Sequence, residues 1–181
     1  MRDSMEITRG DIRDVPELYR LQLLAFESEA EMIGSRNVPA LLETESENAA
    51  DFKNWDVLKI VNDHGEIIAA IRYRLLKDMI EVGRLMVHPA YRRQGLAGRL
   101  LSEVDKKYPD RTKELYTCTK SWTNIRLYEK MGYRAFKEKR KTAAFSLSIC
   151  EKTEFLHCKW RNRVLLFIYN IAIIYIDYES W

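Results

Sequence analysis

The sequence lacks the residue patterns that mark several large classes of protein. Its three cysteines, Cys118, Cys150 and Cys158, are odd in number, widely spaced and in no CxxC arrangement, and its three histidines do not cluster with them. A disulfide framework and a zinc site are therefore both disfavoured, and no metal is expected. The net charge of +3 is the small difference between 30 basic and 27 acidic residues, so no concentrated basic patch predicts a nucleic-acid partner.

Long apolar stretches are also scarce. The N-terminal stretch MRDSMEITRGD has no apolar run after its first arginine, so we expect no secretory signal and a cytoplasmic protein. The apolar run over residues 164–176 is shorter than the roughly 20 residues of a spanning helix, so no membrane span is expected. This run belongs to an apolar C-terminal extension, residues 151–181. We interpret the extension as a strand covering a sheet edge or as a homodimer contact, with a segment under little functional selection as the alternative.

The composition that is present suits one domain with a hydrophobic core, because 46% of the 181 residues are hydrophobic and 31% are charged. Apolar periodicity predicts four helices, with Asp14 as the N-cap of the first: residues 14–26, 38–53, 95–108 and 124–132. Alternating and buried apolar runs predict seven strands: residues 5–9, 55–62, 66–76, 79–88, 114–119, 133–140 and 142–150. Together they indicate an α+β domain over residues 1–150, with a mixed, mostly antiparallel central sheet flanked by helices.

The stretch LMVHPAYRRQGLAGRLLSEV, residues 85–104, has the features of an anion-binding turn. A strand is predicted to end at His88, Pro89 stops the ladder, and Gly95 permits a tight turn where a helix begins. The first amide groups of that helix have no internal partner and carry the positive end of the helix dipole. We therefore predict that the turn binds an anion.

Small and basic residues around this turn favour a pyrophosphate as the anion. Arg92 and Arg93 add positive charge, while Gly95, Ala97 and Gly98 leave room for phosphate oxygens to approach the main chain. The sequence has no GK[ST] pair and no GxGxxG after a strand, so neither of two familiar nucleotide-binding loops fits. A basic, solvated turn is the alternative interpretation.

Two motifs resemble the GCN5-related N-acetyltransferase (GNAT) family. The family signature [RQ]-x-x-G-x-[GA] is matched by residues 92–97, RRQGLA, and the preceding LMVHPAYR is typical of the end of the family's central strand. Downstream, TNIRLYEKMGYRAF carries Asn124, Tyr128 and the pair Gly132-Tyr133 at the expected positions. The resemblance extends over approximately residues 5 to 150.

This resemblance implies a GNAT-like acyl-CoA N-acyltransferase fold, in which acetyl-CoA lies between two splayed central strands. It implies transfer of the acetyl group to a primary amine by direct attack in a ternary complex. Asn124 would contact the pantetheine or phosphate region, although it could be only a helix-start residue. The main chain of three strand residues would contact the pantetheine arm and acetyl group: Leu85, Met86 and Val87. The turn would hold the pyrophosphate: Arg92, Arg93, Gln94, Gly95, Leu96, Ala97 and Gly98.

The chemistry of acetyl transfer adds two candidate catalytic residues. At pH 7, keeping an amine of pKa near 10.4 neutral costs about 4 to 5 kcal/mol, so a base is useful, and Glu81 is the candidate. A strand residue paired with Arg72 or Arg84 is the alternative for Glu81. By the resemblance, Tyr128 would protonate the departing CoA thiolate, the alternative being a core residue of its helix.

The acceptor is expected to be an amine-bearing small molecule or peptide with positive charge. Residues 27–56 contain eight acidic and two basic side chains, a local charge of −6. In the family this segment commonly borders the acceptor pocket, where negative charge would attract a cationic amine. The alternative is the solvated face of a surface helix. Two other functions stay open: a non-catalytic acyl-CoA-binding module and a phosphate-binding interaction domain.

Overall fold

A central sheet organises the computed structural model, which describes residues 5–142 and 145–152. In these residues the sheet has seven strands, in the order β1-β2-β3-β4-β5-β7-β6. All neighbouring strands are antiparallel except β4 and β5, which are parallel. The predicted mixed, mostly antiparallel sheet is therefore confirmed. The strands are β1 (Ile7–Arg9), β2 (Asp56–Val61), β3 (Ile67–Leu76), β4 (Met79–Val87), β5 (Thr112–Cys118), β6 (Arg134–Thr142) and β7 (Phe145–Lys152).

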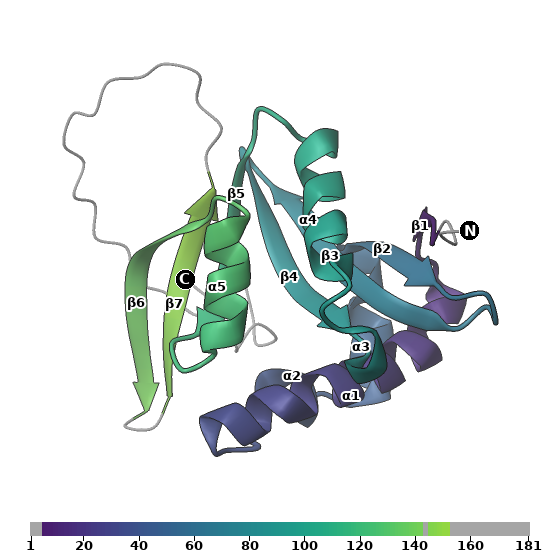
Figure 1. Ribbon diagram of the computed structural model, residues 1–181, viewed down its shortest axis with the longest axis horizontal. Coiled ribbons are helices and arrows are strands. Elements are labelled where there is room, and N and C mark those ends of the chain that lie inside the picture. The colour runs from purple at the N-terminus through teal and green to yellow at the C-terminus, as the bar shows by residue number, and fades with distance from the viewer. Residues whose placement is uncertain (1–4, 143–144, 153–181) are drawn as a thin grey trace.

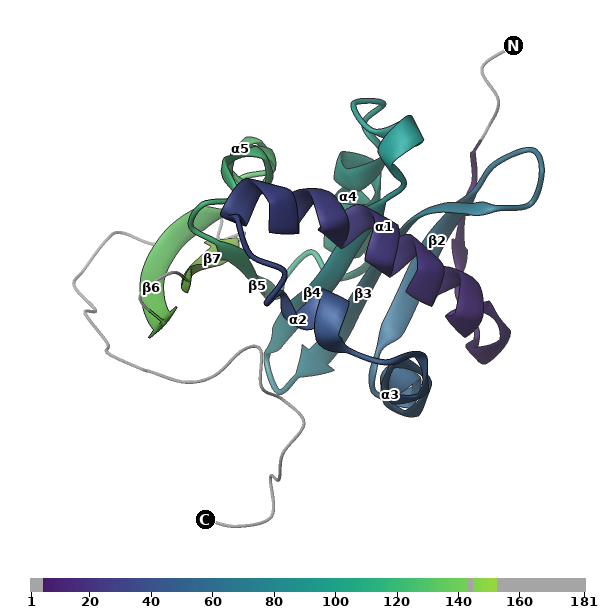
Figure 2. The same cartoon turned by 90° about the horizontal axis from the view of Figure 1, so that it is seen from below.

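Helices cover both faces of this sheet (Figures 1 and 2). Helix α4 packs its buried leucines against β2, β3 and β4, and α5 adds Tyr128 to the same core. Helix α1 packs on the other face, where Leu18 and Leu21 meet Met86 of β4, with α2 and α3 beside it. The helices are α1 (Val15–Ile33), α2 (Pro39–Leu42), α3 (Glu45–Asp51), α4 (Leu96–Lys107) and α5 (Trp122–Lys130).

Asp14 occupies the N-cap position of α1, as predicted. The side chain of Asp14 makes no capping hydrogen bond to α1. It accepts a hydrogen bond from the Asp11 amide at 2.8 Å and pairs with Lys59 of β2 at 2.6 Å. The helix also runs seven residues beyond the predicted end at residue 26, to Ile33, and stops at Gly34, whose φ of 75° suits glycine. The extension matters because residues 27–33 reach α5.

The predicted helix over residues 38–53 is two helices, α2 and α3, broken at Glu43 and Thr44. Thr44 caps α3 in a reciprocal box, in which its hydroxyl accepts from the Glu47 amide and the Glu47 carboxylate accepts from the Thr44 amide. Glu43 is extended and turns its carboxylate toward Arg84. A new helix start therefore interrupts the old one, as the T-x-x-E spacing indicates.

Strand β7 runs to Lys152, the last residue that the structure describes. The predicted domain limit at residue 150 stays a prediction. Residues 153–181, which hold nearly all of the predicted apolar extension, lie outside the described residues, so the strand and homodimer interpretations stay predictions. Within residues 5–142 and 145–152, no helix combines the length and the apolar character that crossing a membrane requires.

Candidate active site

The central feature of the site is the separation of β4 from β5. These strands pair only where Met79–Val82 lies beside Thr112–Leu115. On its other edge, β4 stays paired with β3 as far as Val87. Figure 1 shows β4 and β5 diverging beyond the paired part. The β5-side edge of residues 85–87 therefore has no ladder partner among the described strands, which leaves main-chain groups for a ligand.

A β-bulge sets the side-chain directions at this edge. Gly83 and Arg84 of β4 together oppose the single residue Arg72 of β3, because the register shifts between the pairs Tyr73–Val82 and Ile71–Leu85. A side chain at position 83 would lie 2.8 Å from Trp55 and 2.9 Å from Arg72, so the bulge needs glycine there. Beyond the bulge, Met86 packs toward α1, whereas Leu85 and Val87 pack toward α4.

The predicted anion-binding turn joins β4 to α4. Arg93 and Gly95 have positive φ values of 63° and 80°. This backbone geometry near a helix N-terminus turns amide groups toward a common point. A Cβ at Gly95 would meet no atom within 4 Å, and one at Gly98 would meet only the Met131 sulfur at 3.5 Å. The turn is therefore open in front of the first amides of α4.

An open groove of about 820 Å³ continues from this turn between α4 and α5. It is bordered by Gly95 and Gly98, by Arg99 and Lys106 of α4, and by Lys130 of α5. Glu6 and Glu103 also line the groove, and Glu103 pairs with Lys106 at 3.3 Å, so the turn opens onto a groove of mixed charge.

The two arginines of the turn have different surroundings. Arg92 is half-buried and donates a hydrogen bond to the main-chain oxygen of Ala25 in α1 at 3.0 Å. Arg93 and Gln94 are exposed. The turn is therefore tied to α1 through Arg92, while Arg93 lies free at the surface for an incoming anion. The assignment of these residues to a pyrophosphate stays a prediction.

Tyr128 belongs to the hydrophobic core that α4 and α5 form with the sheet. Its side chain is 8% exposed, and its ring lies 5.9 Å from that of Tyr133, edge to face. Burial, together with the nearby Glu29 carboxylate, raises the pKa of Tyr128 above its usual value. The phenol therefore stays protonated at neutral pH, as a proton donor must.

Asn124 and Glu29 bring α5 and α1 together. The Asn124 side-chain nitrogen lies 3.4 Å from a carboxylate oxygen of Glu29, a contact between residues 95 positions apart. Glu29 is half-buried, and burial raises its pKa to about 7. Sequence reasoning counted Glu29 only as one of eight acidic residues. No local signal could have singled it out, because its environment comes from α5 and β5.

Glu81 lies at the opposite, paired end of β4. It is 8% exposed, and both Nε and Nη2 of Arg74 donate to its Oε2 at 2.7 Å. Arg72 and Arg84, which were considered as partners for Glu81, pair instead with Asp51 and Glu43. The role of Glu81 as a base stays a prediction, and its ion pair is with Arg74.

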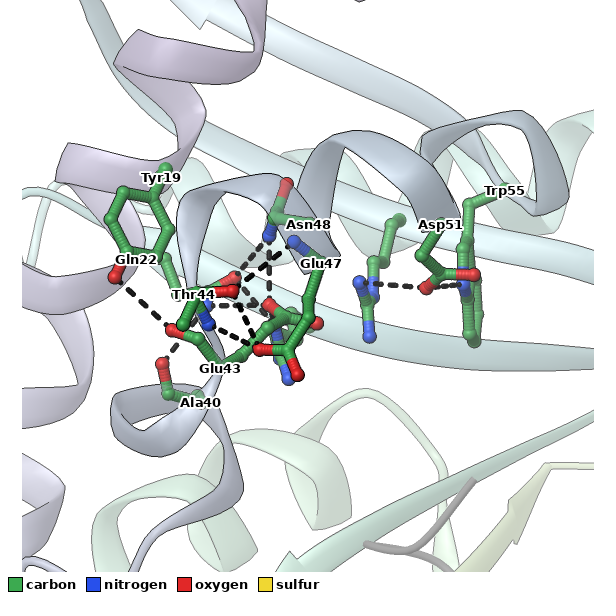
Figure 3. Close-up of polar contacts among 11 residues, drawn as sticks. Tyr19, Gln22, Ala40, Glu43, Thr44, Glu47, Asn48, Asp51 and Trp55 are labelled. Carbon is green, nitrogen blue, oxygen red and sulfur yellow. Dashed lines mark hydrogen bonds and ion pairs between the residues drawn. The ribbon is translucent and has the colours of Figure 1, made fainter. Parts of the chain in front are cut away.

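The acidic segment is mostly engaged by the fold rather than solvated. Figure 3 shows Glu43, Gln22 and Asn48 directed toward one another. Asp51 accepts a hydrogen bond from the Trp55 indole at 2.7 Å and pairs with Arg72. Five of the eight carboxylates are held in ion pairs or in the cap of α3: Glu27, Glu43, Glu47, Asp51 and Asp56.

Glu43 shows how completely this cluster is paired. Burial alone would raise the pKa of Glu43, but the charge of Arg84 and hydrogen bonds from Gln22, Arg84 and Asn48 lower it overall. The carboxylate therefore stays ionised at neutral pH as part of the structure. As for metals, within the described part of the chain no three acidic, histidine or cysteine side chains gather into a group that could hold one.

Together, the divergence of β4 from β5, the open turn before α4 and the buried Tyr128 are the features of the candidate active site. Residues 54–135 match the family model described as "Acetyltransferase (GNAT) domain". The match begins just before β2 and ends in β6, so it includes the turn and Tyr128.

A curated relative and two solved structures add to this match. The UPF0157 protein YqkA of Bacillus subtilis (strain 168) is 25% identical over 155 residues, which are 85% of this chain but 43% of that protein. The chain therefore spans less than half the length of this relative.

The alignments with the two solved structures include nearly all residues of those structures. The ribosomal-protein-S18-alanine N-acetyltransferase of Escherichia coli aligns with a TM-score of 0.67 at 19% identity, over 90% of this chain and 99% of its own. The PaiA N-acetyltransferase of Thermoplasma acidophilum, in complex with coenzyme A, aligns with a TM-score of 0.65 at 18% identity, over 82% of this chain and 98% of its own. At such identities the two structures show the shared fold.

Proposed function

We propose that the chain is an acetyl-CoA-dependent N-acetyltransferase that transfers an acetyl group to a primary amine by direct attack in a ternary complex. The observation that carries this proposal is the splay of β4 from β5 beside the open turn at the start of α4. The GNAT domain match and the coenzyme A bound to a protein of the same fold support it.

The binding part of the proposal assigns three contacts to acetyl-CoA. The free edge of Leu85–Val87 would hydrogen-bond the pantetheine arm, and the main chain of residues 92–98 would hold the pyrophosphate. Asn124 would contact the cofactor from the α5 side. Acetyl-CoA, when bound, supplies an already activated thioester, so the protein's task is to align the acyl carbon with the amine and to manage protons.

The proton-transfer part assigns a role to Tyr128. As the C–S bond breaks, the Tyr128 hydroxyl would donate its proton to the CoA sulfur, and its raised pKa keeps that proton in place until then. The amine must lose a proton before it attacks, and Glu81 is the residue that the sequence nominates for this step.

The finer proposal is that the acceptor is a cationic small molecule or peptide amine. The local charge of −6 supports this proposal less than the sequence indicated, because most of the carboxylates in the segment already have partners in the fold. Within the described residues, three acids of the segment make neither an ion pair nor a capping hydrogen bond: Glu29, Glu31 and Glu45. Exposed carboxylates attract a polycation at a distance, and salt screens that attraction.

The test of the proposed function uses binding and turnover together. Calorimetry should show binding of acetyl-CoA and CoA but not of ATP, and incubation with acetyl-CoA and a panel of primary amines should release free CoA thiol only when an amine is present. Binding without amine-dependent thiol release would indicate a non-catalytic acyl-CoA-binding module. Equal binding of ATP would indicate a phosphate-binding interaction domain.

The acceptor class is tested by comparing a polyamine with a monoamine of similar length. We expect a higher kcat/KM for the polyamine at low salt, and we expect added salt to reduce this preference. The absence of a preference, or a preference that salt leaves unchanged, would contradict a cationic acceptor selected by charge.

A further inference from the structure

We propose that Glu29 is the catalytic residue that accepts the proton of the acceptor amine. This inference rests on the proposed function and names a residue for its proton-accepting step. Sequence reasoning had nominated Glu81, so the structure provides a second, competing candidate at the other end of the splay.

The first argument is position. Glu29 lies one helical turn after Ala25 in α1, and this part of α1 contacts both the turn after β4 and helix α5. On one side Arg92, in the turn after β4, donates to the Ala25 carbonyl at 3.0 Å. On the other side Asn124 of α5 approaches the Glu29 carboxylate at 3.4 Å. Glu29 therefore lies where α1 bridges the open end between β4 and α5.

The second argument is the set of groups that surround the carboxyl. From α5 it is faced by Asn124 and lies close enough to Tyr128 for its charge to raise the pKa of that phenol. From the end of β5 it is close to the Cys118 thiol, beside which Lys120 lies. Among the described residues Glu29 forms no ion pair, and its one hydrogen bond, from Asn124, is long. An incoming ammonium group would give this carboxyl the cationic partner that it lacks among the described residues.

The third argument is the proton affinity of the group. Burial raises the pKa of Glu29 to about 7, close to the pH at which an efficient general base should titrate. Glu81, by contrast, is held by two donors of one guanidinium group and lies in the paired part of β4.

The proposed step moves two protons from the acceptor nitrogen, forms one C–N bond and breaks one C–S bond. The acceptor enters as an ammonium ion, and one N–H proton moves to the Glu29 carboxylate. The neutral nitrogen attacks the acetyl carbon and forms the new C–N bond, and the C–S bond then breaks. A second N–H proton of the tetrahedral intermediate reaches the CoA sulfur through the Tyr128 hydroxyl, which is protonated again at the end. The first proton leaves Glu29 for solvent, so the net products are the amide, CoA thiol and one proton.

The experiment measures kcat/KM against pH for the wild type and for Glu29→Gln, Glu31→Gln and Glu81→Gln. Glu31 lies on the same helix and is exposed, which makes it a matched control. The wild type should lose activity on the acid side with a midpoint near pH 7. Glu29→Gln should lose this limb and fall about 100-fold at pH 8. Glu31→Gln should keep the limb and its midpoint, with only the small, salt-sensitive loss of kcat/KM expected when an exposed carboxylate is removed. Acetyl-CoA affinity of Glu29→Gln should change little.

A second variant and a second readout separate catalysis from folding. Glu29→Asp keeps a carboxyl on a shorter stem, so it should keep the acid limb at a reduced rate. Because the folded state holds the Glu29 proton more tightly than the unfolded state does, wild-type stability should fall as pH rises from about 4.5 to 7. Glu29→Gln should therefore melt at a higher temperature than the wild type at pH 8 and at the same temperature near pH 4.

Each outcome points to one proposal. Binding of acetyl-CoA without amine-dependent thiol release by the wild type would overturn the proposed function, and with it the role of Glu29 in catalysis. An active wild type whose acid limb survives in Glu29→Gln would overturn the role of Glu29 alone. If the acid limb were lost in Glu81→Gln and kept in Glu29→Gln, Glu81 would be the general base.

Discussion

Glu43 and Glu29 come from the same acidic segment, yet the fold places them in opposite environments. Glu43 lies in a cluster where Arg84, Gln22 and Asn48 all donate to it, and its pKa is lowered. Glu29 lies where α1 meets α5, its one hydrogen bond among the described residues is the long contact from the Asn124 side chain, and its pKa is raised. The two carboxyls carry the same formal charge in the sequence.

The difference is between a carboxylate that stabilises the fold and a carboxyl that is available for binding or proton transfer. A buried carboxylate surrounded by donors contributes to folding and has little capacity left for a ligand. A half-buried carboxyl without a cation contributes less to folding but can bind an amine or accept a proton. Counting acids along the segment cannot make this distinction, whereas their hydrogen-bond partners can.

The largest expected effect comes from Tyr128. Tyr128→Phe should lower kcat about 10² to 10⁴-fold and change the KM for acetyl-CoA little, because a proton donor to the leaving thiolate acts in the transition state. Steady-state kinetics with a primary amine measures both constants.

Tyr133→Phe is the matched control for this variant. Tyr133 is a neighbouring buried tyrosine whose hydroxyl has no hydrogen-bond partner within the described part of the chain. Its loss should leave kcat within a few-fold. If Tyr128→Phe turned over as fast as Tyr133→Phe, with chemistry limiting the rate, Tyr128 would be only a core residue.

The next effect concerns the paired cluster. Glu43→Gln leaves Arg84 without its ionic partner in a site where both side chains are largely buried, so it should lower the free energy of unfolding by about 3 kcal/mol at pH 7. Since the pKa of Glu43 is lowered on folding, the stabilisation is present at neutral pH and should be lost as pH falls below about 4.5. Urea denaturation at several pH values measures it.

Glu45→Gln serves as the control for Glu43→Gln, because Glu45 is exposed in the first turn of α3. It should change the free energy of unfolding by less than about 0.5 kcal/mol. Equal stability of the two variants would show that the cluster is not a structural ion pair, and the comparison between Glu43 and Glu29 would fail.

The smallest effect concerns two glycines at the cofactor turn. Gly98→Ala should raise the free energy of unfolding by about 0.5 to 1 kcal/mol, because alanine favours the helix and its Cβ would touch only the Met131 sulfur. Gly95→Ala should lower it by about 1 to 2 kcal/mol, because its φ is 80°. Both should weaken acetyl-CoA binding in calorimetry, since each Cβ narrows the space before the first amides of α4. Normal binding by both variants would place the pyrophosphate elsewhere.

Local patterns in the sequence predicted the elements but not the long-range contacts of the site. The strand, turn and helix over residues 85–104 follow from apolar spacing, Pro89 and Gly95, and α4 begins and ends within a residue of the prediction. The Thr44-x-x-Glu47 spacing could also have indicated the break between α2 and α3.

The contacts that define the site are not encoded locally. The hydrogen bonds of Arg92 to Ala25 and of Asn124 to Glu29 join residues 67 and 95 positions apart. They depend on a helix α1 that runs past residue 26 and on the exact splay of two strands. The contact of Glu29 with Asn124 and its raised pKa, which distinguish it from the other seven acids of the segment, are therefore visible only in the folded structure.

The strand order has a consequence for how the chain folds as it is synthesised. β7 lies between β5 and β6, although it follows both in the sequence. Strands β1 to β4 can pair with their sequence neighbours as soon as they emerge, whereas β5 gains its full-length antiparallel neighbour only after residue 152. Until then β5 and its unpaired edge are exposed to other chains. We therefore expect β5, β7 and β6 to complete the sheet last, and a nascent chain that ends before residue 145 to expose the unpaired edge of β5.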